Sequence, residues 1–280
     1  MLVIFAYLFV ALFAHWVAPY GESQVFDTPY ANWAYIPHWS WLGPIPYWVT
    51  FEPTGSEFLL GTDQLGRDML TRLIYGARNT IGIAVATTLL SFAIGGGLGI
   101  LAAVRGGWFD QILSRAVDVL MAIPSLIFAL MLLSIFGSSV LNLIIIIAIL
   151  DSTRVFRLSR AVAMNVVVMD FVEAARLRGE RLAWIMRREI LPNVLPPLVA
   201  EFGLRFCFVF LTISALSFLG VGIQPPTADW GSMVRENATL ITYGNVTPLL
   251  PAGAIALLTV AVNFVVDWFL HKTSGLRDEH

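Results

Sequence analysis

The chain has 280 residues, of which 58% are hydrophobic and 13% are charged, and its mean hydropathy is +0.77. Its formal net charge is −2, with 17 Lys and Arg against 19 Asp and Glu, and Cys207 is its one cysteine. This composition excludes an ordinary soluble domain and an internal disulfide, and it favours a polytopic membrane protein. The sequence contains no basic patch with interleaved aromatic residues, the pattern that would indicate nucleic-acid binding.

Residues 1–18 are almost wholly apolar, and their number is close to the ~20 that a membrane-spanning helix needs. A basic n-region is missing, and Val17-Ala18-Pro19 is a poor signal-peptidase site. We therefore expect residues 1–18 to form a retained first transmembrane helix.

Residues 19–80 contain no long apolar run and predict an excursion outside the membrane. The four tryptophans between residues 30 and 50 are typical of an interfacial aromatic belt, which we favour. The alternative is a lip that meets a substrate-binding protein. After Gly61, the apolar Leu65 and Met69 interleaved with Arg67 and Arg72 predict a short amphipathic helix that leads into the membrane.

Five further apolar stretches follow and bring the predicted transmembrane helices to six; they are residues 81–104, 110–136, 141–150, 195–221 and 248–270. Within them, Pro124 marks a kink, and Gly95 and Gly99 form a small-xxx-small pair that lets another helix approach closely. Glu201 and Arg205 are spaced i, i+4, which predicts an ion pair on one helix. Ionisable residues in a span indicate function, but snorkelling or a structural pair explains these two equally well.

The loop 161–193 lies between the fourth and fifth of these helices. Eight of the 17 Lys and Arg fall between Arg154 and Arg188, and an arginine at the bilayer centre costs about 2.5–3.5 kcal/mol on insertion scales. This segment therefore belongs in water. Just before it, Arg154, Arg157 and Arg160 share a helix face. We expect them to contact anionic headgroups, and the alternative is a contact with a partner subunit.

Two short amphipathic helices are predicted within the loop. We expect Asp170 to cap the first, with Glu173 three residues later as in a capping box. Gly179 permits a bend between the helices, and Pro192 ends the second because proline lacks the N–H donor. The two apolar stripes are Phe171, Val172 and Ala175, and then Leu182, Ile185, Met186 and Ile190.

The string Glu173-Ala174-Ala175, followed by Gly179 and then Ile190-Leu191-Pro192, resembles the EAA motif of ABC importer permeases. The common spacing in that family puts Ile one position earlier, where this chain has Glu189. The dipeptide/oligopeptide/nickel branch has the later Ile and the ILPN ending seen here. Residues 61–78, GTDQLGRDMLTRLIYGAR, and residues 218–231, FLGVGIQPPTADWG, resemble the same branch.

This resemblance implies an all-α polytopic membrane protein with six transmembrane helices, similar to the type I ABC importer permeases, with a cytoplasmic coupling loop. Residues 1–18 are then the first transmembrane helix, 19–80 a periplasmic excursion with its amphipathic lead-in, 81–270 the permease core with loop 161–193, and 271–280 a cytoplasmic tail. Family members usually begin with a basic cytoplasmic tail, so the pattern indicates a truncated or misassigned start. The ATPase-coupling residues carried over by the motif are Glu173, Ala174, Ala175, Gly179, Ile190, Leu191 and Pro192.

The distribution of positive charge supports this orientation without the motif. With loop 161–193 inside, twelve Lys and Arg lie on the cytoplasmic side and both termini are cytoplasmic, as the positive-inside rule requires. Four lie outside, namely Arg67, Arg72, Arg78 and Arg235, while Arg205 lies in a span. We therefore expect a multi-pass protein of the bacterial inner membrane.

The resulting functional hypothesis is a permease subunit of an ATP-driven, binding-protein-dependent importer of peptides or a similar small solute. The chain has no GxxxxGK[ST] loop, so we expect it to be no enzyme and to bind no cofactor or metal, with ATP and magnesium on partner subunits. The expected partners are a second, different permease, two ATPase subunits, a periplasmic or lipid-anchored binding protein, and the bilayer. The alternatives are an importer of nickel chelates or opines and, from other classes, a passive channel or an intramembrane hydrolase.

Overall fold

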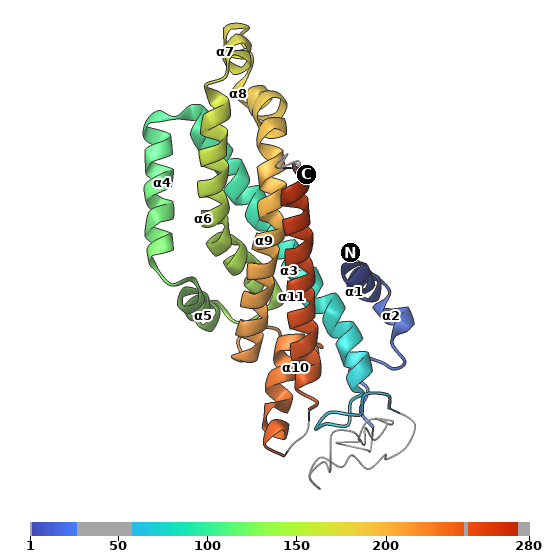
Figure 1. Ribbon diagram of the computed structural model, residues 1–280. Coiled ribbons are helices and arrows are strands. Elements are labelled where there is room, and N and C mark those ends of the chain that lie inside the picture. Colours follow the sequence, from blue (N-terminus) through green and yellow to red (C-terminus); the bar gives the residue numbers. More distant parts are fainter. Residues whose placement is uncertain (1, 27–57, 244–245, 274–280) are drawn as a thin grey trace. The chain divides into compact units, whose positions relative to one another are not determined.

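A computed structural model describes residues 2–26, 58–243 and 246–273 (Figure 1). The tryptophan-rich segment 30–50 and the tail after Thr273 lie outside these residues. The described part is all-helical, with one isolated antiparallel bridge between Thr62 and Asp68 and no strand. Its helices are α1 (Leu2–Leu12), α2 (Ala14–Val17), α3 (Met69–Arg105), α4 (Gly107–Ala122), α5 (Ser125–Phe136), α6 (Val140–Val167), α7 (Asp170–Leu177), α8 (Leu182–Ile185), the π turn η3 (Met186–Ile190), α9 (Leu191–Phe218), α10 (Trp230–Asn237), the 3₁₀ turn η4 (Ala238–Tyr243) and α11 (Leu249–Thr273).

Three described helices are long and apolar enough to cross a membrane: Met69–Arg105, Leu182–Phe218 and Leu249–His271. The apolar stretch 110–136 is divided at Pro124, where a kink was expected: α4 and α5 meet there with a bend of 88°. The predicted helix over residues 1–18 is divided between α1 and α2, and α1 has only 11 residues. Such a helix is about 16 Å long, short of the roughly 30 Å hydrocarbon core.

The predicted short helix before residue 81 is also corrected. Helix α3 runs without a break from Met69 to Arg105, so the lead-in and the second apolar stretch are one helix of 37 residues. Position 76 of this helix is a glycine because any side chain there would collide with Trp230: an added Cβ would come within 2.7 Å of Trp230 Cδ1. Close packing thus explains a glycine in the middle of a long helix.

The described residues form two compact units, which are considered separately. The first comprises Met1–Ile83 and Phe210–Ala261. Trp230, at the start of α10, is almost completely buried in it, and its indole nitrogen donates to Leu73 O at 3.0 Å. Asp229 caps α10 by accepting a hydrogen bond from Ser232 N, and it accepts another from Thr80 Oγ1, both at 2.9 Å. Burial raises the pKa of this carboxyl, against the effect of these hydrogen bonds.

The predicted amphipathic pattern around residue 67 holds for Met69, which is buried, and fails for Leu65 and the arginines. Leu65 is 54% exposed, whereas Arg72 is 1% exposed. The arginines are buried because they are paired: Arg67 lies 2.6 Å from both Asp63 Oδ2 and Glu236 Oε2, and Arg72 Nη2 lies 3.4 Å from the same Glu236 oxygen. Asp63 is only four residues from Arg67, but Glu236 is 169 positions away and leaves no periodic signal in the sequence.

The second unit comprises Ala84–Val209 and Val262–His280. In it α6 packs against α4 and α5 (Figure 1). Arg160 of α6 is hydrogen-bonded through Nε and Nη2 to the carboxylate of Asp110 on α4, and Arg157 Nη1 lies 3.8 Å from Met121 Sδ. The predicted headgroup contact of this arginine face is therefore replaced, at Arg160, by a bond within the protein.

Candidate functional site

The loop 161–193 is held to the second unit by an apolar anchor. Val172 and Ala175 of α7 and Ile185 and Ile190 of the next helix are buried in one cluster. The cluster is completed by side chains of α3, α6 and α9, namely Ile100, Val104, Ala163, Val194 and Leu198. Burial of Val172, Ile185 and Ile190 stabilises the loop by about 1.5–3 kcal/mol each, and Ala175 adds less, which offsets the cost of ordering so short a helix. The loop is therefore a packed part of the unit.

Gly179 ends α7 in a Schellman motif. Its φ is +79°, a region that L side chains seldom adopt. Gly179 N donates to Arg176 O at 2.9 Å, and Glu180 N donates to Ala175 O at 3.2 Å, which is the pair of bonds that defines the motif. Glycine at position 179 is thus explained by local backbone geometry.

The outer face of α7 has no cover in the described part of the chain. Glu173 and Ala174 are exposed, and so are two large apolar side chains, Leu177 at 83% and Phe171 at 41%. Phe171 and Leu182 were predicted on the buried stripes, and both placements are wrong, because each side chain is 41% exposed. Only a few positions of the eight-residue α7 can face the anchor at once, and the two that do are Val172 and Ala175.

Two further predictions about the loop are wrong. The N-cap of α7 is Met169, and Asp170 is the first helical residue. Pro192 does not end the second helix, because α8, η3 and α9 form one continuous helix, Leu182–Phe218. The π turn η3, in which Leu191 N donates to Met186 O, opens the backbone just before Pro192. Such turns are a common way for a helix to accommodate an irregularity.

The motif residues therefore divide into two sets. Ala175 and Ile190 are buried in the anchor, whereas the others face outward: Glu173, Ala174, Gly179, Leu191 and Pro192. Arg178 Nη2 lies 3.9 Å from Glu189 Oε1 and its guanidinium 6.0 Å from the centre of the Trp184 ring. Arg176 Nη2 donates to Val104 O at the end of α3. The outward set is the part that a partner can contact.

Gly95 and Gly99 lie against α6, the helix that leads into the loop. An added Cβ on Gly99 would come within 2.7 Å of Phe156 O and 2.9 Å of Ser159 Cβ. One on Gly95 would overlap Ser152 O. The backbones of α3 and α6 can approach this closely only because both positions lack a side chain.

Glu201 and Arg205 belong to a cluster that joins three helices. Arg205 Nε lies 2.6 Å from Glu201 Oε1, and its Nη1 lies 3.8 Å from Asp151 Oδ1 on α6. Asp151 also accepts a hydrogen bond from Ser91 Oγ of α3 at 2.8 Å. Sequence reasoning missed Asp151 and Ser91 as members, because only i, i+4 pairs on one helix leave a visible spacing.

We expect Arg205→Met to destabilise the chain strongly, because it leaves the carboxylate of Asp151, which is 7% exposed, without its cation. Removing one partner of a buried pair costs about 3–5 kcal/mol. Glu201→Gln should destabilise the chain less, since Arg205 would still be paired with Asp151. Adding Asp151→Asn to Arg205→Met should recover more stability than adding Glu201→Gln does. Thermal unfolding of the purified protein measures all four variants, and an unchanged midpoint for Arg205→Met would show that the cluster is not a buried ion pair.

No three His, Cys, Asp or Glu side chains of the described residues gather closely enough to hold a metal ion.

Comparison with known proteins identifies the family of the chain. The di/tripeptide transport system permease protein DppC of Pseudomonas aeruginosa is 36% identical over 97% of this chain and 82% of that protein. The dipeptide transport system permease protein DppC of Haemophilus influenzae is 34% identical over 83% of this chain and 76% of that protein.

Among solved structures, a chain of the MetNI methionine ABC transporter in an inward-facing form is similar to this protein. The match covers 73% of this chain and 97% of the MetNI chain, with a TM-score of 0.57 and 18% sequence identity. This likeness shows the fold. The family model of binding-protein-dependent transport system inner membrane components matches residues 95–272. The chain therefore belongs to the family of binding-protein-dependent transport system inner membrane components, and it is a multi-pass membrane protein.

Proposed function

We propose that this chain is a permease subunit of an ATP-driven importer, that it translocates peptides delivered by a binding protein, and that loop 161–193 couples it to an ATPase subunit. The names of the two DppC relatives support peptides as the substrate class. The observation that carries the coupling role is the loop itself: α7 is anchored on one face and leaves Leu177 and Phe171 uncovered on the other. Single exposed apolar side chains are normal on a protein surface, and these two support an interface because they stand on a helix that carries the motif residues Glu173 and Ala174, which are also exposed.

The geometry gives a route for the motion. A displacement of α7 by the ATPase reaches Ile185 and Ile190 through the shared anchor. These residues lie on the helix that continues as α9, so the displacement passes along Leu182–Phe218 into the membrane. A packed anchor moves as one body, because interiors at crystal-like density resist deformation. Rocking of α9 against its neighbours would then open the path alternately to the two sides.

The proposed topology has six membrane passages, with residues 1–18, α3, the bent α4–α5 pair, α6, α9 and α11 in turn, and with both termini and the loop in the cytoplasm. The excess of Lys and Arg on the loop side supports it. Cysteine introduced at Arg178, in a background without Cys207, should react with an impermeant maleimide only from the cytoplasmic side, and cysteine at Leu65 only from outside. Reaction of both from one face contradicts the topology.

Transport itself tests the substrate class. Proteoliposomes that hold the full complex, with its ATPase, second permease and binding protein, should accumulate a radiolabelled dipeptide when ATP is supplied. Omission of this chain should abolish the accumulation. A complex that accumulates a nickel chelate or an opine and excludes dipeptides would assign the alternative substrates of the same branch.

A further inference from the structure

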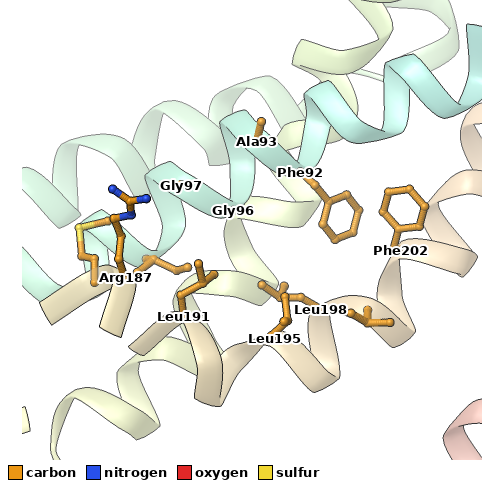
Figure 2. A pocket seen from close by; sticks show the side chains of 12 residues that line it. Phe92, Ala93, Gly96, Gly97, Arg187, Leu191, Leu195, Leu198 and Phe202 are labelled. Atoms are coloured by element: carbon orange, nitrogen blue, oxygen red, sulfur yellow. The ribbon is translucent and has the colours of Figure 1, made fainter. Parts of the chain in front are cut away.

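An apolar pocket of about 570 Å³ opens between α3 and the helix Leu182–Phe218 in the second unit. Phe92 and Phe202 close one end with ring centres 5.2 Å apart. Arg187 lies at the opposite end (Figure 2). From Arg187 to Phe202 the pocket follows four turns of helix, which is about 20 Å at 1.5 Å per residue. This is the length scale of a lipid acyl chain and much longer than an amino-acid side chain.

The floor and walls of the pocket are built for hydrocarbon. Gly96 and Gly97 of α3 form part of the floor, and a Cβ on Gly97 would meet nothing within 4 Å. Leu195 and Val199 of α9 line the pocket while remaining about half exposed. Among the twelve lining residues Arg187 alone is charged, and the others are apolar or glycine. A peptide in transit carries charges and amides, and this lining offers them almost nothing to bind.

The guanidinium of Arg187 is free of ion pairs and side-chain hydrogen bonds among the described residues, and it is exposed at the mouth of the pocket. Its neighbours on the loop differ: Arg178 has Glu189 nearby, and Arg176 bonds to Val104 O. Both helices that form the pocket are long and apolar enough to cross a membrane, and Arg187 lies at their loop end. Basic side chains at that depth between membrane helices are suited to anionic lipid headgroups.

We propose that this pocket binds one anionic phospholipid, with an acyl chain along α3 and α9 and its phosphate against Arg187. The hydrocarbon chain covers the half-exposed Leu195 and Val199, and the phosphate supplies the anion that Arg187 lacks among the described residues. The site requires only that α3 and α9 span the bilayer, so it stands apart from the assignment of peptides as the substrate. The lipid would also brace η3 against α3, directly beside the anchor of the coupling loop.

The test uses the full chain in nanodiscs doped with photoactivatable phosphatidylglycerol or photoactivatable phosphatidylcholine, followed by mapping of the labelled peptides. Phosphatidylglycerol should label residues 92–100 and 186–202 about fivefold more than phosphatidylcholine does, which is the factor one arginine contributes beside an anionic headgroup. Arg187→Gln should remove this preference. Arg188→Gln, which deletes the same charge from the adjacent exposed position outside the pocket, should preserve it.

Gly97→Leu provides the second arm, because its side chain would enter the open space of the pocket and should reduce labelling by both lipids. Equal labelling by the two lipids, with no effect of Arg187→Gln, would overturn the proposal. Labelling of the isolated chain that disappears in the assembled complex would also overturn it, since another protein subunit would then be the occupant. Retention of dipeptide transport has no bearing on either outcome, so failure here is distinguishable from failure of the proposed function.

Discussion

Replacing Gly179 with valine is expected to lower the amount of ATPase that co-purifies with the complex by a factor of about 5–30. The φ of +79° at this position costs a β-branched residue roughly 1–2 kcal/mol, and that energy corresponds to such a factor. The free loop can relax the strain by unwinding the end of α7. The docked loop cannot, because the Schellman bonds of Gly179 and Glu180 set the direction in which α8 leaves.

The membrane part should remain folded in this variant, because a Cβ on Gly179 meets no atom within 4 Å. Transport should fall with ATPase occupancy, and the binding protein should bind its ligand as before. Gly179→Asn is the matched control, since asparagine tolerates the left-handed region far better than valine. It should keep most of the ATPase. Glu173→Lys should act in the same direction but more weakly, because a charge in the first turn of a helix contributes about 0.3–1 kcal/mol.

Co-purification of the ATPase and dipeptide uptake into vesicles are the two measurements. If the Gly179→Val complex retains all its ATPase and transports normally, loop 161–193 is not the coupling element. If valine and asparagine lose the ATPase equally, backbone conformation is not the reason, and the open space beside Gly179 must be occupied by the partner.

Local patterns in the sequence predicted the inner half of the loop well. Val172, Ala175, Ile185 and Ile190 were expected on apolar stripes and are buried together, because helical spacing alone decides which positions share a face. Phe171 shows the limit of this reasoning. Phe171 is hydrophobic and was expected to be buried, but it is exposed because Val172 and Ala175 occupy the face of α7 that packs on the anchor.

Pairings between distant segments could not be predicted. Glu236 neutralises Arg67 from 169 positions away, so the sequence around Arg67 resembles an exposed polar face. The ion pair between Asp151 on α6 and Arg205 on α9 was missed for the same reason, namely that its two members are far apart in the sequence. The bend at Pro124 was expected, but its 88° angle was not, since proline permits a kink while packing of α4 and α5 against α6 sets its size.

Gly99→Ala and Gly95→Ala should each destabilise the protein by about 1–3 kcal/mol, the usual cost of forcing one extra carbon into a filled core. The added carbon on Gly99 would press on Phe156 O and Ser159 Cβ, and backbone atoms cannot rotate away as a side-chain end can. Separation of α6 from α3 would also displace the start of the coupling loop, because Val104 of α3 and Ala163 of α6 both belong to its anchor. The two substitutions should therefore lower ATPase recovery together with thermal stability.

Gly82→Ala on the same helix is the control, because a Cβ at Gly82 meets nothing within 4 Å. Glycine is about 0.8–1.0 kcal/mol less favourable than alanine inside a helix, so this variant should be neutral or slightly more stable. Thermal unfolding of the three variants in one detergent compares one chemical change at three positions. Equal shifts at positions 82, 95 and 99 would mean that helix propensity governs the result and that the close approach of α3 to α6 contributes nothing. A loss at 95 and 99 with none at 82 would locate the stability in that approach, and the accompanying loss of ATPase would tie it to the loop.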